Sequence, residues 1–455
     1  MAPAVVVSSA IKYRLLANFQ AIRLVILEPG SEDDPITCRL FHAELGHQDY
    51  EALSYEWGDA SSTDPEITVD HTEVRIRQNL HDALWNLRLE NDERCLWIDS
   101  MCINQSDVLE RNHQVELMGK IYSQSKNTIA WLGVARNNSN DAIDKLLEFD
   151  GFLSSRGKEY IDLLVEGKGE SSAYRPGKVY VQTTQLDAII AMANRSYWSR
   201  MWIVQEIQLP KQLMLHCGAK SISPLSFFSF LEMATVNQGS YGYDLEGTLA
   251  FFLLGRRHDK KQSRKDTLHD WLSGCLAQPT SGLAKPFTCS EPRDMVYALL
   301  GVSSDCQNGE LRPDYAKPLI DVYMDVYEII SRRAPKDAQY SSYDLEGATR
   351  TEYFPLQVEN DLALRLGLIK KSRHSRNERK FDRVANLPVS HLLGPLGRFQ
   401  LVLWDFFLWD VAVTIMEPVW ATIRWMIYIS LGVILNSLLA LDYVWSKVTG
   451  LPRRS

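Results

Sequence analysis

One short stretch, residues 52–59 (ALSYEWGD), constrains the fold of this chain more than any other. Its apolar start gives way abruptly to a bulky aromatic residue, a glycine and an acid, as in a buried strand that opens into a loop. In open α/β sheets, ligands bind where loops leave the carboxyl ends of the strands. We therefore expect a functional site at the end of this strand. Two later stretches, residues 95–105 and 197–206, are predicted to meet it.

Strand and helix patterns alternate from residue 52 onward. The apolar runs at 52–55, 95–98 and 127–132 have the length and composition of strands that are covered on both faces. Helical periodicity separates them, in one helix that Asn79 is predicted to cap and in another over about residues 107–125. Strands joined by crossover helices are typical of a parallel sheet.

Further strands are predicted around the central one. Residues 22–27 and 37–44 indicate one β-hairpin, and residues 66–70 and 73–76 indicate another. The predicted fold class is therefore α/β, with a mostly parallel sheet, flanking helices and added N-terminal β-hairpins. A mainly helical region and a hydrophobic C-terminal tail are expected to follow.

The alternation is interrupted at residues 136–184, where polar, Gly- and Ser-rich sequence indicates an insertion with short helices of its own. The pattern resumes with a helix at about 184–207. The predicted segments are, in order, a lead-in at 1–21, an α/β domain at 22–217, a helical region at 218–335, a linker at 336–398, hydrophobic helices at 399–446 and a basic tail at 447–455.

Composition and motifs exclude several functions. The net charge of −8, without a long basic run, argues against a nucleic-acid binder. The seven cysteines include no CxxC pair, so we expect reduced thiols of a cytosolic or nuclear protein and predict no metal site. Neither GxGxxG nor GxxxxGK[ST] occurs, which argues against a Rossmann dehydrogenase and a P-loop NTPase.

The C-terminal region is the most hydrophobic part of the chain. Residues 425–441 form a run of 17 without a charge, flanked by aromatic residues, which predicts a short membrane span. The preceding run, 399–416, contains Asp405 and Asp410, each of which would cost about 2.5–3.5 kcal/mol at a bilayer centre, so an interfacial helix is expected there. The prediction is a cytoplasmic domain with a membrane-associated tail. The alternative is a hydrophobic helical hairpin that folds onto the soluble domain or onto a partner.

Several ordered motifs resemble those of the fungal heterokaryon-incompatibility (HET) domain. The motifs are YEALSYEWG (50–58), Asn79-Leu80, LWID (96–99), CINQ (102–105), WLG (131–133) and WSRMWIVQE (198–206). The resemblance covers about residues 22–217. Two further pieces, CSEPRDMVYALLG (289–301) and PDY (313–315), resemble the family's usual continuation.

This resemblance implies both a fold and a role. The family is associated with non-self recognition after fungal cell fusion and with the programmed cell death that follows. It is also thought to be remotely similar to TIR domains, which have a flavodoxin-like sheet and some of which hydrolyse NAD. Their catalytic glutamate often lies in a Trp-x-x-x-Glu setting, and the spacing of Trp202 and Glu206 matches it. The resemblance thus implies Glu206 as a catalytic residue and NAD as a possible substrate, while no cofactor is firmly predicted.

The residues themselves allow this chemistry. Trp202 and Glu206 are four apart and so lie on one face of a helix. A carboxylate there could hold ribose hydroxyls or stabilise the oxocarbenium-like charge of glycosidic cleavage. An aromatic wall from Trp57 or Trp202 could stack on nicotinamide or adenine. The predicted ligand-binding set consists of Ser54, Trp57, Gly58, Asp99 and Trp202.

Each assignment has a structural alternative. Glu206 could form a cap or a salt bridge, Trp202 and Trp57 could be packing residues, and Asp99 could cap the next helix instead of facing a crevice with Asp59. Three functions remain open: an NAD glycohydrolase, a non-enzymatic death adaptor that self-associates, and an effector that acts on membranes through its tail. Expected partners are a second copy of the chain, another incompatibility protein or a membrane.

Overall fold

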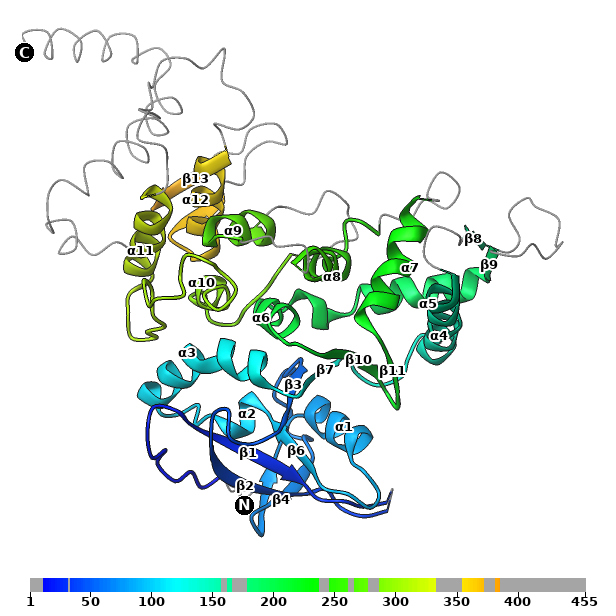
Figure 1. Ribbon diagram of the computed structural model, residues 1–455. Helices are drawn as coiled ribbons and strands as arrows, with labels where there is room; N and C mark the ends of the chain where they lie inside the picture. Colours follow the sequence, from blue (N-terminus) through cyan, green and yellow to red (C-terminus); the bar gives the residue numbers. More distant parts are fainter. Residues whose placement is uncertain are drawn as a thin grey trace, which may run out of the picture. The chain divides into compact units, whose positions relative to one another are not determined.

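The computed structural model describes residues 11–31, 33–156, 162–165, 178–236, 245–260, 266–276, 286–332, 354–371 and 381–384 (Figure 1). The predicted hydrophobic helices at 399–446 and the basic tail lie outside these residues, as do the start of the lead-in and most of the predicted linker. Within the described ranges, no helix has the length and apolar character needed to cross a membrane. The chain divides into two compact units, Met1–Leu366 and Gly367–Ser455.

The first unit is built on a nine-stranded sheet with the order β11-β10-β7-β3-β6-β1-β2-β4-β5 (Figure 1). Its strands are β1 (Ala21–Leu27), β2 (Thr37–Glu44), β3 (Glu51–Tyr55), β4 (Glu66–Val69), β5 (Thr72–Arg75), β6 (Arg94–Trp97), β7 (Asn127–Trp131), β10 (Leu213–Cys217) and β11 (Lys220–Ile222). The predicted α/β class is confirmed.

Four neighbouring strands, β6, β3, β7 and β10, run parallel. In chain order they form the arrangement 2-1-3-4, which is the beginning of the flavodoxin-like order 2-1-3-4-5. The residues of β3 and β7 are buried after the first one of each strand, as the continuous apolar runs predict. In such sheets the ligand crevice lies where the strand order reverses, which here is between β3 and β7.

The sheet is mixed rather than mostly parallel, which corrects the sequence-based prediction. Strand β1 pairs antiparallel with both β2 and β6, so the first hairpin continues the parallel core instead of standing apart from it. The reason is that β1 is almost completely buried and apolar except for Arg23, and such a strand needs partners on both edges. The second hairpin, β4–β5, joins through a parallel pairing of β2 with β4.

Helices flank the sheet and continue beyond it. Those of the first unit are α1 (Gln78–Leu87), α2 (Asp99–Cys102), α3 (Val108–Gln124), α4 (Ser139–Arg156), α5 (Thr183–Ala193), a 3-10 helix (Ser196–Ser199), α6 (Ile203–Gln208), α7 (Pro224–Val236), α8 (Leu249–Lys260), α9 (Leu268–Leu276), α10 (Asp294–Tyr297), α11 (Leu319–Ser331) and α12 (Phe354–Arg365). The helix predicted at about 184–207 is thus three shorter pieces.

Two small sheets complete the described structure. The predicted insertion contains the long helix α4 and a parallel pair, β8 (Asp162–Val165) with β9 (Lys178–Val181), rather than short helices alone. In the second unit, β12 (Ile369–Lys371) pairs antiparallel with β13 (Phe381–Val384).

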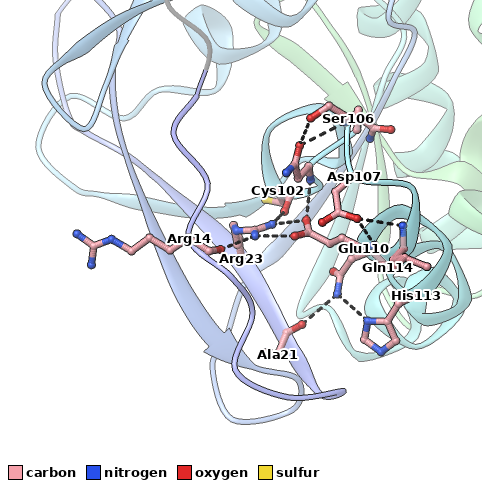
Figure 2. A network of polar contacts seen from close by, with 12 residues as sticks. Arg14, Ala21, Arg23, Cys102, Ser106, Asp107, Glu110, His113 and Gln114 are labelled. Carbon is pink, nitrogen blue, oxygen red and sulfur yellow. Dashed lines mark hydrogen bonds and ion pairs between the residues drawn. The ribbon is translucent and has the colours of Figure 1, made fainter.

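A buried network fixes the N-terminal segment to the sheet (Figure 2). Arg23 of β1 pairs with Glu110 of α3 through two contacts, of 2.5 and 2.8 Å, and also donates to the carbonyl oxygens of Cys102 and Arg14. Asp107 caps α3 by accepting from the backbone N–H groups of residues 109 and 110. The segment before β1 and the loop before α3 are therefore held by the same guanidinium.

Candidate functional site

The carboxyl end of β3 sends polar side chains to both faces of the sheet, because successive residues of a strand alternate. On one face, the Ser54 hydroxyl donates to Glu206 Oε2 and is hydrogen-bonded to the Tyr197 hydroxyl at 2.6 Å. On the other face, the Tyr55 hydroxyl is hydrogen-bonded to Ser100 Oγ at 2.6 Å. Ser54, Tyr197 and Glu206 are buried, so the end of the strand leads into an enclosed polar cluster.

Arg200 adds a positive charge to this cluster. Its Nη1 lies 3.4 Å from Glu206 Oε2, the oxygen that also accepts from Ser54. Glu206 is 1% exposed, and its Oε1 has no hydrogen-bond partner among the residues that the structure describes. Since an unpartnered buried carboxylate oxygen is costly, a further donor at this position would be stabilising.

A distant segment positions the loop that carries Arg200. Met201 N donates to Thr288 O at 2.9 Å, and Thr288 N donates to Ser199 O at 2.6 Å. These bonds form a parallel bridge between Arg200 and Thr288. The geometry of the Arg200–Glu206 pair therefore depends on residues that lie far beyond Glu206 in the sequence.

Helix α6, which carries Glu206, is packed closely against two glycines. A Cβ atom built on Gly301 would overlap Gln205 Oε1 and lie 2.9 Å from Gln205 Cδ and 3.3 Å from the Cα of Gly119. The Gln205 amide in turn donates to Tyr297 O at 3.3 Å. Small residues at 119 and 301 thus let α3, α6 and the segment after α10 approach each other.

A second carboxyl group lies next to this cluster, at the start of α2. Asp99 accepts hydrogen bonds from the Trp57 indole N–H, at 2.9 and 3.1 Å, and from Ser100 N at 2.7 Å. The helix-capping alternative does not hold in the usual sense, because Ile98 is the N-cap of α2 and Asp99 is its first helical residue. The bond to Trp57 joins Asp99 to the loop after β3. Asp99 is 9% exposed and Trp57 is 37% exposed, so Trp57 separates this carboxyl group from solvent.

The loop after β3 turns at Gly58. This glycine has φ +73°, and nothing lies within 4 Å of the position that a Cβ would occupy. Glycine is therefore favoured at position 58 because the backbone is left-handed there, and not because a side chain would lack space. Asp59 follows on the exposed part of the loop, whereas Asp99 is buried, so the two acids do not share an environment.

The two buried carboxyl groups hold protons more tightly than they would in water. Burial, and secondarily the charge of Glu206, raises the pKa of Asp99 to about 6, although Arg200 opposes this shift. Burial also raises the pKa of Glu206, against the lowering effects of Arg200 and Ser54. Burial acts to lower the pKa of Arg200, but the charges of Glu206 and Asp99 outweigh it and raise that pKa. Arg200 is thus a fixed cation beside two acids whose pKa values are both raised by burial.

Trp202 is placed differently from Glu206, although the two residues are one helical turn apart. Glu206 points to Ser54, whereas the Trp202 side chain forms a hydrogen bond with the Asp294 carboxylate and packs against the core of the sheet. The structure therefore brings four of the predicted residues close together: Ser54, Glu206, Asp99 and Trp57. The side chain of Trp202 points away from them.

Sequence reasoning missed Tyr197 and Arg200 as site residues. Both lie in the stretch 197–206 that was expected to meet the end of β3, but no local pattern shows which of its side chains turn inward. The spacing of six residues between Arg200 and Glu206 could have indicated that the two side chains pair.

The prediction that Asn79 caps a helix is wrong. Helix α1 begins at Gln78, and Arg77 occupies the N-cap without a side-chain bond. Asn79 instead donates to Glu56 O at 2.6 Å and accepts from the Trp131 indole at 3.0 Å. It therefore links the carboxyl ends of β3 and β7, on either side of the expected crevice.

A hollow of about 360 Å³ lies at the carboxyl end of β3. Tyr55, Trp57, Ser100 and Gln105 are among its lining residues, and Glu206 is not. A ligand in this hollow would contact Trp57, whose indole N–H is bonded to Asp99. In the described part of the chain, no group of three or more His, Cys, Asp or Glu residues is placed to hold a metal ion.

Comparisons with known proteins find a match over the part of the chain that contains these residues. Residues 50–206 match the family model described as heterokaryon incompatibility protein (HET), which runs from the residue before β3 to Glu206. The chain is 29% identical over 341 residues to heterokaryon incompatibility protein 6, OR allele, of Neurospora crassa, which covers 65% of the chain and 49% of that protein. The chain thus matches about half the length of this relative. No solved structure matches.

Proposed function

We propose that this chain, a fungal HET-domain protein, acts in non-self recognition and programmed cell death by hydrolysing NAD at Glu206. The family assignment supports the general role. The mechanism rests on one observation: a buried glutamate, with one oxygen unpartnered among the described residues, lies beside an arginine at the end of β3, next to the reversal of strand order.

The proposed reaction breaks the bond between the ribose C1′ and the nicotinamide nitrogen. The bonding electrons leave with nicotinamide, water adds to C1′, and the proton of the water is released, which gives ADP-ribose. Glu206 stabilises the positive charge that develops on the ribose or holds its hydroxyls. Ser54 and Arg200 hold the carboxylate in place and favour its ionised form, because both act to lower its pKa against the larger, raising effect of burial. Trp57 provides a face on which a flat ring can stack.

The burial of Glu206 means that this activity requires a conformational change. Glu206 is 1% exposed, so a substrate reaches it only after the residues around it have moved apart. We propose that assembly with a second copy, or with another incompatibility protein, provides this opening. Activity should therefore be measured on concentrated or crowded protein.

The test is NAD consumption by the purified full-length chain, beside Glu206→Gln and the control Glu246→Gln, which alters an exposed acid of the helical region. Circular dichroism establishes that all three proteins are folded. We expect the Glu206 variant to lose at least about 100-fold in turnover, as when a group that stabilises transition-state charge is removed, and the control to match the wild type. Equal turnover in all three would remove Glu206 from the reaction.

A second candidate function is that of an adaptor without enzymatic activity. The burial of Glu206 and its bonds to Ser54 and Arg200 are also what a structural ion pair would show. Under this hypothesis, Glu206→Gln stays toxic when expressed in a fungal cell, and a substitution that prevents self-association abolishes the toxicity. The membrane-associated tail at 425–441 stays a prediction, and deletion of that segment tests its part in toxicity.

A further inference from the structure

A large hollow lies at the opposite, amino-terminal end of the parallel strands. It is a groove of about 790 Å³ between the first residues of β3, β6, β7 and β10 and the helices α7 and α8. Its volume is within the range of about 300–1,000 Å³ that is usual for small-molecule sites. Neither the family relationship nor the proposed chemistry of Glu206 accounts for it.

A half-buried cation without a counter-ion lies in this groove. Arg257 of α8 donates to Ile207 O at 2.6 Å and to Pro210 O at 2.9 Å. No carboxylate of the described residues pairs with it, and burial alone lowers its pKa. The two carbonyl oxygens satisfy hydrogen bonds of the guanidinium but do not neutralise its charge, so an anion in the groove would be attracted to it.

Two further cations line the same groove. Lys126 and Lys211 precede the adjacent parallel strands β7 and β10, whose register pairs Leu213 with Thr128 and so places the two lysines side by side. Both are exposed, and neither forms an ion pair with a described residue.

The other charged side chains of the groove are mostly neutralised. Arg94 pairs with Glu51 at 2.6 Å, and Glu93 pairs with Arg39 at 2.5 Å. Only Asp49 adds an acid outside these pairs, so Arg257, Lys126 and Lys211 leave the groove with an excess of positive charge.

The wall formed by α7 and α8 has an apolar part beside Arg257. Phe228 and Leu254 are buried at its base, and Leu225 at the start of α7 is 52% exposed. An exposed leucine next to unpaired cations favours a ligand that combines an apolar part with an anionic group. The apolar part would cover the leucine, and the anionic group would pair with the cations.

We infer that this groove binds a single-chain amphipathic anion, with a carboxylate or phosphate head at Arg257, Lys126 and Lys211 and an alkyl chain against Leu225 and Phe228. The inference does not depend on NAD hydrolysis, since the groove lies at the other end of the strands. It assigns the protein a lipid-like small-molecule ligand in addition to its incompatibility function.

The test is isothermal titration of the full-length protein with decanoate, with inorganic phosphate and the neutral decanol as separate arms. Decanoate should bind, and the other two should bind at least about tenfold more weakly, because each lacks one half of the recognised chemistry. The double variant Lys126→Gln/Lys211→Gln should weaken decanoate binding roughly tenfold and reduce its salt dependence. Leu225→Gln should weaken it about threefold or more.

A matched control separates the groove from the rest of the protein. Lys120→Gln removes an exposed lysine from the outer face of α3 and should leave decanoate binding unchanged. All variants alter exposed side chains, so each is expected to fold, and circular dichroism verifies this. Binding that is equal in the wild type and in the double variant would overturn the inference, as would phosphate binding as tightly as decanoate.

Discussion

Two Arg–Glu pairs among the described residues of the first unit are built very differently. Arg23 and Glu110 form two contacts, of 2.5 and 2.8 Å, and Glu110 also accepts from Asn104 N at 2.7 Å (Figure 2). Arg200 and Glu206 share one contact of 3.4 Å, and one oxygen of Glu206 lacks a partner among the described residues. The first pair uses both carboxylate oxygens and the second uses one.

This difference separates a structural role from a candidate functional one. A buried ion pair stabilises a fold only when its geometry is good and its remaining polar atoms are bonded. The Arg23 pair approaches that condition, because the guanidinium also binds the carbonyl oxygens of Cys102 and Arg14 and lies 4.7 Å from the centre of the Tyr13 ring. The Arg200 pair falls short of it at the place in the sheet where ligands are expected.

The largest effect on stability is expected at Arg23. Arg23→Met leaves Glu110 buried without its partner and should lower the free energy of unfolding by about 3–5 kcal/mol. Denaturant unfolding of the full-length protein, followed by circular dichroism, measures this. The double variant Arg23→Met/Glu110→Met should recover much of the loss, since two apolar side chains leave no buried charge. A loss of under about 1 kcal/mol in the single variant would show that the Arg23–Glu110 pair is not a structural ion pair, and the contrast with the Arg200–Glu206 pair would fail.

The next effect is expected where α6 meets the glycines. Gly301→Ala adds a methyl group that overlaps Gln205 Oε1, and overpacking of this kind should cost about 1–3 kcal/mol of stability. The matched control is Gly151→Ala in α4, where nothing lies within 4 Å of the added atom, and this change should be neutral or slightly stabilising. A thermal shift assay compares the two. If both alanines are tolerated equally, α6 is not held by this contact.

A pH dependence should come from the second pair's neighbour, Asp99. Its pKa is raised to about 6 in the folded protein, above that of an unfolded aspartate. The folded state therefore binds the proton more tightly, and the resulting stabilisation is full below about pH 4 and lost as the pH rises through 6.

The variant Asp99→Asn tests this sign. Between about pH 4.5 and 7, the free energy of unfolding of the variant should fall by roughly 2 kcal/mol less than that of the wild type. Part of the fall should remain in the variant, because the pKa of Glu206 is raised as well. Unfolding midpoints at a series of pH values measure it. A steeper fall in the variant would contradict the assigned direction.

The smallest effect is expected at Trp57. Trp57→Phe keeps a ring but removes the N–H that binds Asp99, and should cost about 1 kcal/mol because the ring is partly exposed. Trp57→Tyr is the matched variant, since its hydroxyl offers a donor again. Thermal unfolding detects the loss, and quenching by acrylamide reports how exposed the remaining tryptophans become. A loss above about 3 kcal/mol would make Trp57 a structural residue rather than a movable cover.

The sequence predicted the parts of this structure that depend on local patterns. The apolar runs at 52–55, 95–98 and 127–132 correspond to parallel strands, and the expectation that residues 197–206 meet the end of β3 is confirmed by the bond between Ser54 and Glu206. Burial along a strand is encoded in consecutive residues, so it can be recognised without knowledge of the partner strands.

Contacts between distant residues could not be predicted in this way. Nothing near β1 indicates that it pairs with β6 as well as with β2, and nothing near Asn79 indicates that its amide links Glu56 and Trp131. The inward direction of Arg200 likewise depends on Thr288, which no local pattern connects to it. These features follow from tertiary packing, which overrides local preferences.

The bridge between Arg200 and Thr288 also bears on how such a gene can recombine. The stretch that matches the HET family ends at Glu206, whereas part of the framework for its last residues is encoded further downstream. A chimaera that exchanges residues 50–206 alone would combine the Arg200 loop of one protein with the Thr288 segment of another. An exchange that keeps the geometry of Arg200 should therefore include residues 286–301 as well.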